Sequence, residues 1–211
     1  MVTPASSTRR VEGIEVILFD LDNTLYPPAA GLIEAGDRLI AQFIARRLDM
    51  PLEQADRLRV RLWREYGATA RGLQVEYGIP QREYFAGSIE LLPIEQYLQP
   101  DPQLAELLRA LRQRRFVFTN STEAYARRVL QALGVEECFE GVYHIEFTGG
   151  SPKPEPQSYR AVLRDLGLPA QRVALVDDTE ANLEPAADLG MLTIKLHDPP
   201  HSPRHLHLAD L

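Results

Sequence analysis

Cysteine is nearly absent from this chain of 211 residues. Cys138 is the only one, so no disulfide can form within the chain, which is typical of a reducing compartment. Long apolar stretches are also absent, and the first ten residues are polar, without the apolar segment of a secretory signal. We therefore expect a cytoplasmic protein with no membrane partner, in which residues 1–13 form a disordered lead-in.

Positive charge is scarce as well. The chain has 23 lysines and arginines against 30 aspartates and glutamates, a formal net charge of −7. This balance argues against binding to nucleic acid polymers, which need a surplus of basic side chains. It does not exclude a small anionic substrate, which responds to the donors close to it. Only two of the basic residues are lysines, Lys153 and Lys195.

Five short apolar runs, rich in branched and aromatic residues, are typical of buried strands. They cover residues 16–19, 116–118, 142–145, 173–176 and 192–196. The last four runs alternate with helical patterns, at residues 103–112, 123–133, 155–166 and 179–190. This alternation predicts an α/β fold, a doubly wound parallel sheet of about five strands.

The segment between the first two runs is too long for a simple crossover. It carries helical patterns of its own at residues 33–48, 52–66 and 82–91, and prolines cluster at both of its ends. We therefore predict a core domain of residues 14–25 and 101–211, with a helical cap domain of residues 26–100 inserted after the first strand. The cap is either a lid over a site or a packing appendage, and its position beside Asp22 favours the lid.

The C-terminal segment holds four of the five histidines, at positions 197, 201, 205 and 207. Histidine is a common metal ligand, so a metal site is one interpretation. Prolines lie between these histidines, and a solvated tail or a final edge segment is the interpretation that we favour.

Polar residues follow the apolar runs at the points where a parallel sheet would bring them to one edge. Asp20 and Asp22 follow the first run, Thr119 and Asn120 the second, and the pair Asp177-Asp178 the fourth. Lys153 precedes the third core helix. Ligands bind beyond the carboxyl ends of the strands in such sheets, so we expect these side chains to form one site. Taken singly, each acid could equally cap a helix or a turn.

Several carboxylates in one cleft repel one another unless a cation lies among them. Oxygen ligands of this kind suit Mg²⁺, which keeps other positions for water and substrate phosphate. Lys153 and the hydroxyl of Thr119 would then donate to phosphate oxygens. Asp20 could attack phosphorus to form an aspartyl-phosphate, while Asp22 could protonate the leaving oxygen and later deprotonate water.

With these motifs the chain resembles the phosphatases of the haloacid dehalogenase (HAD) superfamily. Asp20-Leu21-Asp22-Asn23-Thr24 is similar to the first motif, Thr119-Asn120 to the second, Lys153-Pro154 to the third and Val176-Asp177-Asp178-Thr179 to the fourth, in the family's order. The segment after the first motif matches the helical cap of subfamily I.

The resemblance implies a role for each residue. Asp20 would be the nucleophile and a metal ligand, and Asp22 the acid/base, binding metal through its backbone carbonyl. Thr119, Asn120 and Lys153 would bind the phosphoryl group. Asp178 would ligate Mg²⁺ directly and Asp177 would be an additional ligand or lie behind it. The substrate would be a small phosphorylated metabolite.

A narrower resemblance is to the pyrimidine 5′-nucleotidase branch, through Asp22-Asn23-Thr24-Leu25-Tyr26-Pro27 and the run Arg71-Gly72-Leu73. Residues 86–90 read Ala-Gly-Ser-Ile-Glu where that branch often carries a His-Asp pair. Pyrimidine nucleoside 5′-monophosphates are thus the leading substrates, and a sugar phosphate or phosphoglycolate phosphatase, or a mutase, is the alternative.

Three other protein classes fit less well. A dehalogenase of the same superfamily lacks an acid at the position of Asp22. A receiver domain carries its acidic pair before the phosphoacceptor, whereas here the pair comes last. A non-catalytic phosphate-binding module would be expected to have lost Asp20, Asp22 or Lys153. The sequence does not specify an oligomeric state.

Overall fold

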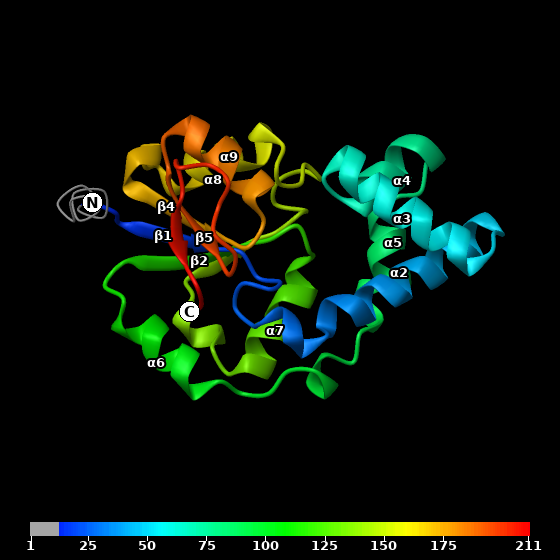
Figure 1. Cartoon of the computed structure of the whole chain (residues 1–211), viewed down its shortest axis with the longest axis horizontal. Helices are drawn as coiled ribbons and strands as arrows, with labels where there is room; N and C mark the ends of the chain where they lie inside the picture. The colour runs from blue at the N-terminus through cyan, green and yellow to red at the C-terminus, as the bar shows by residue number, and fades with distance from the viewer. Residues whose placement is uncertain (1–12) are drawn as a thin grey trace.

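The structure is a computed structural model that describes residues 13–211. The predicted lead-in therefore lies, except for Gly13, outside the described residues. Six strands form one parallel sheet in the order β3-β2-β1-β4-β5-β6 (Figure 1). Their bounds are β1 Val16–Phe19, β2 Arg114–Phe118, β3 Gly141–Tyr143, β4 Val173–Asp177, β5 Leu192–Leu196 and β6 Leu206–Leu208. The predicted α/β class is confirmed, with one strand more than expected.

The order of the strands places a topological switch point between β1 and β4. From β1 the chain moves outward through β2 to β3, and it then returns to β4 and moves outward in the other direction. Neighbouring strands at such a point diverge toward helices on opposite faces, which opens a crevice beyond their carboxyl ends. The sheet therefore offers a site directly after Phe19 and Val176, which are register partners.

Four helices cover the two faces of the sheet. Helices α6 Pro102–Ala110 and α7 Glu123–Leu133 pack on one face, and α8 Pro156–Leu166 and α9 Glu180–Leu189 on the other. The side chains of β1 alternate between these layers: Phe19 packs with α6 and α7, whereas Val16 and Leu18 pack with α8 and α9. This period of two is what a strand buried on both faces requires.

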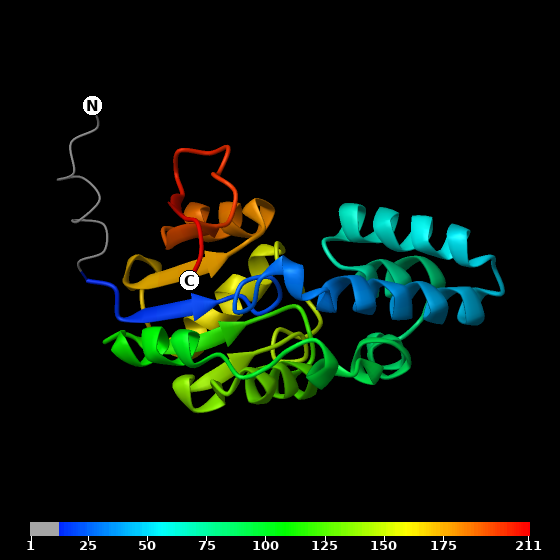
Figure 2. The same ribbon diagram turned by 60° about the horizontal axis from the view of Figure 1, so that its bottom comes forward.

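The inserted segment forms four helices beyond the carboxyl edge of the sheet. They are α2 Leu32–Leu48, α3 Leu52–Tyr66, α4 Thr69–Tyr77 and α5 Gln81–Gly87. Figure 2 shows α2 and α3 side by side, reaching away from the sheet. A third apolar cluster joins these helices, with Ile44, Leu62 and Leu73 fully buried. Short 3₁₀ helices at Pro28–Ala30, Ile89–Leu91 and Ile94–Gln96 lie along the two connections to the core.

Helix α4 was not expected from the sequence. It contains Gly72, a poor helix former, and shows only a short apolar pattern. A Cβ at Gly72 would lie 2.8 Å from Leu62 Cβ, so the glycine allows α4 to pack closely on α3. Tertiary packing therefore outweighs local propensity here.

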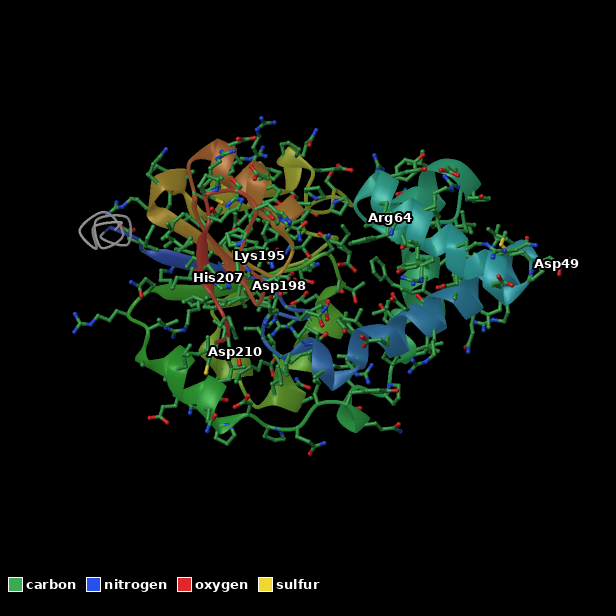
Figure 3. All side chains as sticks on the ribbon, in the orientation of Figure 1. Asp49, Arg64, Lys195, Asp198, His207 and Asp210 are labelled. Atoms are coloured by element: carbon green, nitrogen blue, oxygen red, sulfur yellow. The ribbon has the colours of Figure 1, made fainter. Side chains whose placement is uncertain are left out.

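The histidine-rich segment ends in an edge strand. β6 pairs with β5, and Figure 3 shows Lys195 and His207, partners in that pairing. His205 is buried, with Nδ1 2.7 Å from Thr193 Oγ1 and Nε2 3.1 Å from Glu184 Oε1. The final edge segment that we favoured is confirmed for residues 206–208. No helix within residues 13–211 has the length and apolar character needed to cross a bilayer, and the cytoplasmic location stays a prediction.

Candidate active site

The register of the central strands brings the first and the fourth motif together. Phe19 pairs with Val176, and the N–H of Asp20 donates to the carbonyl of Val176 at 2.8 Å. Asp20 and Asp177 therefore lie side by side at the carboxyl ends of two neighbouring strands. Asp20 is 8% exposed and Asp177 is fully buried.

Lys153 lies between these two aspartates. Its Nζ is 2.7 Å from Asp20 Oδ1 and 2.7 Å from Asp177 Oδ2, and the residue is 1% exposed. Burial alone would lower the pKa of Lys153, but attraction to Asp177 and Asp20 raises it above its ordinary value. The ammonium group is thus charged at neutral pH and fixed at the carboxyl edge of β1 and β4.

Asn120 holds the loop that carries Lys153. Its Oδ1 accepts a hydrogen bond from the backbone N–H of Lys153 at 2.7 Å, and its Nδ2 donates to the carbonyl of Lys153 at 2.9 Å. The neighbouring Thr119 is 2% exposed, and its hydroxyl accepts the N–H of Ser121 at 3.1 Å. The amide of Asn120 therefore orients Lys153, and the Thr119 hydroxyl faces the cavity at the end of β2.

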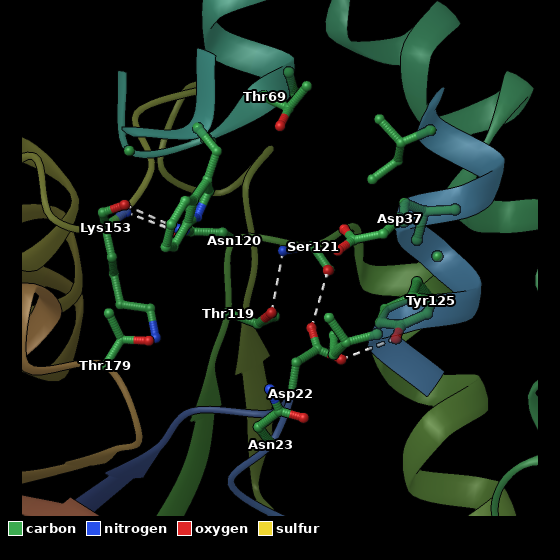
Figure 4. Close-up of a pocket in the computed structure, with 18 of the residues that line it drawn as sticks. Asp22, Asn23, Asp37, Thr69, Thr119, Asn120, Ser121, Tyr125, Lys153 and Thr179 are labelled. Atoms are coloured by element: carbon green, nitrogen blue, oxygen red, sulfur yellow. Dashed lines mark hydrogen bonds between the residues drawn. The ribbon is translucent and has the colours of Figure 1, made fainter. Parts of the chain in front are cut away.

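Asp22 lies across the cavity from Lys153, surrounded by hydroxyl groups. Tyr26 Oη and Tyr125 Oη donate to Asp22 Oδ1 at 2.6 and 2.8 Å, and Ser121 Oγ lies 3.4 Å from Oδ2. Figure 4 shows the side chains of Asp22, Ser121 and Tyr125 directed at one another. Burial raises the pKa of Asp22, and the hydrogen bonds from the two tyrosines act against that shift.

The acidic pair at the end of β4 consists of a fully buried carboxylate, Asp177, and a more accessible one, Asp178. Asp177 accepts hydrogen bonds from the N–H of Thr179 at 2.8 Å and from Nδ2 of Asn182 at 3.1 Å. These bonds and Lys153 satisfy both of its oxygens. Asp178 lines the cavity, and burial, reinforced by the charge of Asp177, raises its pKa to about 6.

The donor set fits a hard divalent cation. Asp20, Asp177 and Asp178 each offer a carboxylate oxygen, and these oxygens lie within 4.8 Å of one another. Among residues 13–211, only Lys153 forms an ion pair with any of these three or with Asp22. Burial raises the pKa of Asp20 well above its ordinary value, and the charges of its neighbouring aspartates add to that shift. Carboxylates with so little compensating charge favour a bound cation, and oxygen-only ligands suit Mg²⁺.

A cavity of about 570 Å³ connects these residues to the cap. Six of the seven side chains expected from the sequence line it, and Asp177 lies behind Lys153. The cap contributes Asp37 from α2, Arg59 and Trp63 from α3 and Tyr84 from α5. Sequence reasoning missed these four, and also Tyr26, Tyr125 and Asn182. Two of these residues carried a signal: Trp63 is the chain's single tryptophan, and Tyr26 belongs to the run 22–27, one of those on which the narrower resemblance rests.

Comparison with known proteins places the chain in a family. The family model described as haloacid dehalogenase-like hydrolase matches residues 14–190. "Phosphate metabolism protein 8" of Saccharomyces cerevisiae is 28% identical over 194 residues, which are 84% of this chain and 60% of that protein. Phosphoglycolate phosphatase of Aquifex aeolicus is 26% identical over 186 residues, 85% of this chain and 83% of that one.

The fold has solved counterparts as well. The crystal structure of a HAD phosphatase from Thermococcus onnurineus superposes with a TM-score of 0.64 at 17% identity, covering 93% of this chain and 94% of the other. The chain spans about three fifths of the length of the yeast relative. The extent of the family match shows that the chain belongs to the haloacid dehalogenase-like hydrolases.

Proposed function

We propose that this haloacid dehalogenase-like hydrolase is a Mg²⁺-dependent phosphomonoesterase that acts through an aspartyl-phosphate. One observation carries the proposal. The ammonium group of Lys153 lies 2.7 Å from Asp20 and 2.7 Å from Asp177, while a second acid, Asp22, faces the same cavity with its own hydrogen-bond partners. A nucleophile, a cation for phosphate and a separate proton carrier are the groups that phosphoryl transfer to an aspartate needs.

In the first step a carboxylate oxygen of Asp20 attacks phosphorus. The ester P–O bond breaks, its electron pair goes to the leaving oxygen, and Asp22 supplies the proton that the oxygen takes up. The ammonium group of Lys153 and the hydroxyl of Thr119 donate to the phosphoryl oxygens that do not react. The products are an aspartyl-phosphate on Asp20 and a free alcohol.

In the second step Asp22 takes a proton from water. The water oxygen attacks phosphorus, the bond to Asp20 breaks, and inorganic phosphate leaves with the carboxylate of Asp20 restored. Tyr26 and Tyr125 keep the carboxylate of Asp22 in one orientation during both steps. Asp20, Asp178 and the backbone carbonyl of Asp22 would hold Mg²⁺, with Asp177 behind them. When bound, the ion offsets the repulsion between the carboxylates and the phosphate.

The leading substrates are pyrimidine nucleoside 5′-monophosphates. The motif resemblance around Asp22 and the size of the cavity, about 570 Å³, support this choice. The second candidate is phosphoglycolate or a sugar phosphate, because one relative is named a phosphoglycolate phosphatase and another a glyceraldehyde 3-phosphate phosphatase. A non-catalytic phosphate-binding module is disfavoured, because Asp20, Asp22 and Lys153 are all present.

The test is hydrolysis of p-nitrophenyl phosphate by the purified chain. We expect activity with Mg²⁺, loss of activity with EDTA, and loss in Asp20→Asn with an unchanged circular dichroism spectrum. Asp188→Asn is the matched control, because Asp188 pairs with Arg204 at 2.7 Å and does not line the cavity. Wild-type hydrolysis by Asp20→Asn would rule out the mechanism. Equal rates across a panel of nucleotides and sugar phosphates would rule out the nucleotidase assignment alone.

A further inference from the structure

The cap side of the cavity carries a cation whose charge is already compensated. Arg59 Nη1 lies 2.7 Å from Asp37 Oδ1, and Arg59 Nε lies 2.9 Å from Asp56 Oδ1. The Arg59 side chain is 16% exposed and that of Asp37 is 36% exposed, so this ion pair is partly buried. Arg59 and Asp37 both line the cavity. This end of the cavity therefore offers hydrogen-bond donors and acceptors but no uncompensated positive charge.

Tyr84 supplies a polar group without a partner at the same end of the cavity. The residue is 5% exposed and lines the cavity, and its ring packs edge-on against Phe43 and Phe85 at centroid distances of 6.0 and 5.0 Å. Within residues 13–211 its hydroxyl forms no side-chain hydrogen bond, although Asp37 is near enough to help burial raise the pKa of Tyr84. In the part of the chain that the structure describes, the only fully buried side-chain polar atom without a partner is Asn23 Oδ1, so the Tyr84 hydroxyl is open to the cavity and can hydrogen-bond to a ligand there.

Trp63 adds a flat apolar surface to these polar groups. It lies on α3 one turn after Arg59, it is 52% exposed, and it lines the cavity. Because Trp63 lines the cavity and is only half-buried, part of its ring is free for contact with a ligand. Planar rings stack on such surfaces.

Building on the proposed function, we infer that Arg59, Asp37, Tyr84 and Trp63 form the leaving-group subsite, and that it selects a neutral planar ring carrying both a donor and an acceptor, the chemistry of a nucleobase. The guanidinium donates to a ring carbonyl, the carboxylate accepts from a ring N–H, and the Tyr84 hydroxyl can do either. The indole offers a face for the ring.

The same subsite disfavours an acidic leaving group. Glycolate, the leaving group of phosphoglycolate, carries a carboxylate that needs an uncompensated cation. Asp37 and Asp56 already occupy the guanidinium of Arg59, and a third carboxylate there would be repelled. The ion pair between Arg59 and Asp37 would thus favour a nucleotide over phosphoglycolate, although both would bind at the same phosphoryl site.

Steady-state kinetics tests the role of the ion pair. We expect kcat/KM for uridine 5′-monophosphate to exceed that for 2-phosphoglycolate at least tenfold. Asp37→Asn removes one of the two carboxylates that compensate Arg59, the one that lines the cavity, and should move this ratio toward phosphoglycolate about tenfold. Asp188→Asn, which removes a carboxylate from the Arg204 pair outside the cavity, should leave the ratio unchanged. A ratio that Asp37→Asn does not move overturns the inference.

Binding without turnover tests Tyr84 and the stacking surface. In Asp20→Asn, the fluorescence of the only tryptophan, Trp63, should be quenched by uridine 5′-monophosphate and much less by inorganic phosphate. Adding Tyr84→Phe should weaken nucleotide binding about fivefold, as for one lost hydrogen bond. Tyr77→Phe is the control, since Tyr77 is 40% exposed and does not line the cavity. Equal quenching by phosphate and nucleotide would contradict the subsite.

The two proposals fail in different ways. If p-nitrophenyl phosphate is not hydrolysed, the proposed function is wrong, and the fluorescence titration still decides whether the subsite binds a nucleotide. If p-nitrophenyl phosphate is hydrolysed but Asp37→Asn and Tyr84→Phe change neither ratio nor affinity, the function stands and the subsite assignment is wrong.

Discussion

Tyr125 donates a 2.8 Å hydrogen bond to Oδ1 of Asp22, a residue 103 positions earlier in the chain, and Tyr26 donates to the same oxygen at 2.6 Å. One tyrosine comes from α7 and the other from the start of the cap connection. Two buried hydroxyls on one oxygen fix the direction of the carboxylate and leave Oδ2 beside Ser121 at 3.4 Å. Both tyrosines are therefore positioning residues for the proposed acid/base.

Removing the Tyr125 hydroxyl should slow the hydrolysis of esters with a poor leaving group more than that of esters with a good one. An alkoxide needs the proton from Asp22 far more than p-nitrophenolate does. We expect Tyr125→Phe to lower kcat for an alkyl phosphate about tenfold and for p-nitrophenyl phosphate much less. Tyr143→Phe is the control, because Tyr143 donates to Asp165 at 2.9 Å outside the cavity. Equal losses with both leaving groups would contradict the positioning role.

Lys153 should also contribute to the stability of the folded protein. Replacing it by methionine leaves Asp20 and Asp177 buried without their shared cation, and breaking a buried ion pair costs about 3–5 kcal/mol. We expect Lys153→Met to lower the free energy of unfolding in urea by about that amount at pH 8. Adding Asp20→Asn should restore part of the loss, since one of the unpaired charges is removed. No recovery in the double variant would show that the loss has another cause.

The parts of the site that follow strands were predictable from the sequence. An apolar run followed by acids places those acids at a sheet edge, and the parallel order then brings Asp20, Lys153 and Asp178 together. The apolar run also predicts which of its side chains face each layer of helices, because side chains alternate along a strand. This is why the order of the motifs carried so much information.

The groups that orient the site were not predictable in the same way. Tyr125 reads as an ordinary apolar position of α7, because it packs inward with Val129, and only its hydroxyl reaches Asp22. Arg59 and Asp37 meet across two cap helices, and no local pattern specifies such a pair. Long-range side-chain partners depend on the packing of the helices, which periodicity leaves open.

The raised pKa of Asp178 makes the stability of the metal-free protein depend on pH. Aspartate ionises near pH 4 in an unfolded chain, whereas burial and then Asp177 raise the pKa of Asp178 to about 6. Between these values the unfolded chain has lost the proton that the folded protein keeps. Asp178 therefore lowers stability as pH rises from 4 to 6, and its effect is constant above that.

Metal-free Asp178→Asn should consequently be more stable than the wild type at pH 7.5, and this advantage should shrink at pH 4.5. Mg²⁺ should raise the melting temperature of the wild type at pH 7.5 but have little effect on the variant, because a bound ion stabilises only the folded state that holds it. Thermal unfolding with and without EDTA measures both effects. An Asp178→Asn protein that responds to Mg²⁺ as the wild type does would rule out Asp178 as a ligand of the proposed Mg²⁺ site.

Gly67 lies where the cap approaches the loop that carries Lys153. It ends α3 with φ +74°, and a Cβ there would lie 2.7 Å from Pro154 Cδ and 3.2 Å from the carbonyl oxygen of Lys153. Gly67→Ala must therefore strain its own backbone and also displace the loop that holds Lys153. We expect a loss of about 1–2 kcal/mol in stability and a fall in kcat/KM of about tenfold or more.

Gly78→Ala separates the effect of backbone strain from the effect of the displaced loop, since Gly78 has φ +66° with no atom within 4 Å of the added carbon. That variant should lose similar stability and keep its activity, because only the backbone strain is common to both glycines. Urea unfolding and p-nitrophenyl phosphate kinetics on the two variants measure the difference, and equal activity in both would mean that the contact between the cap and the Lys153 loop does not affect catalysis.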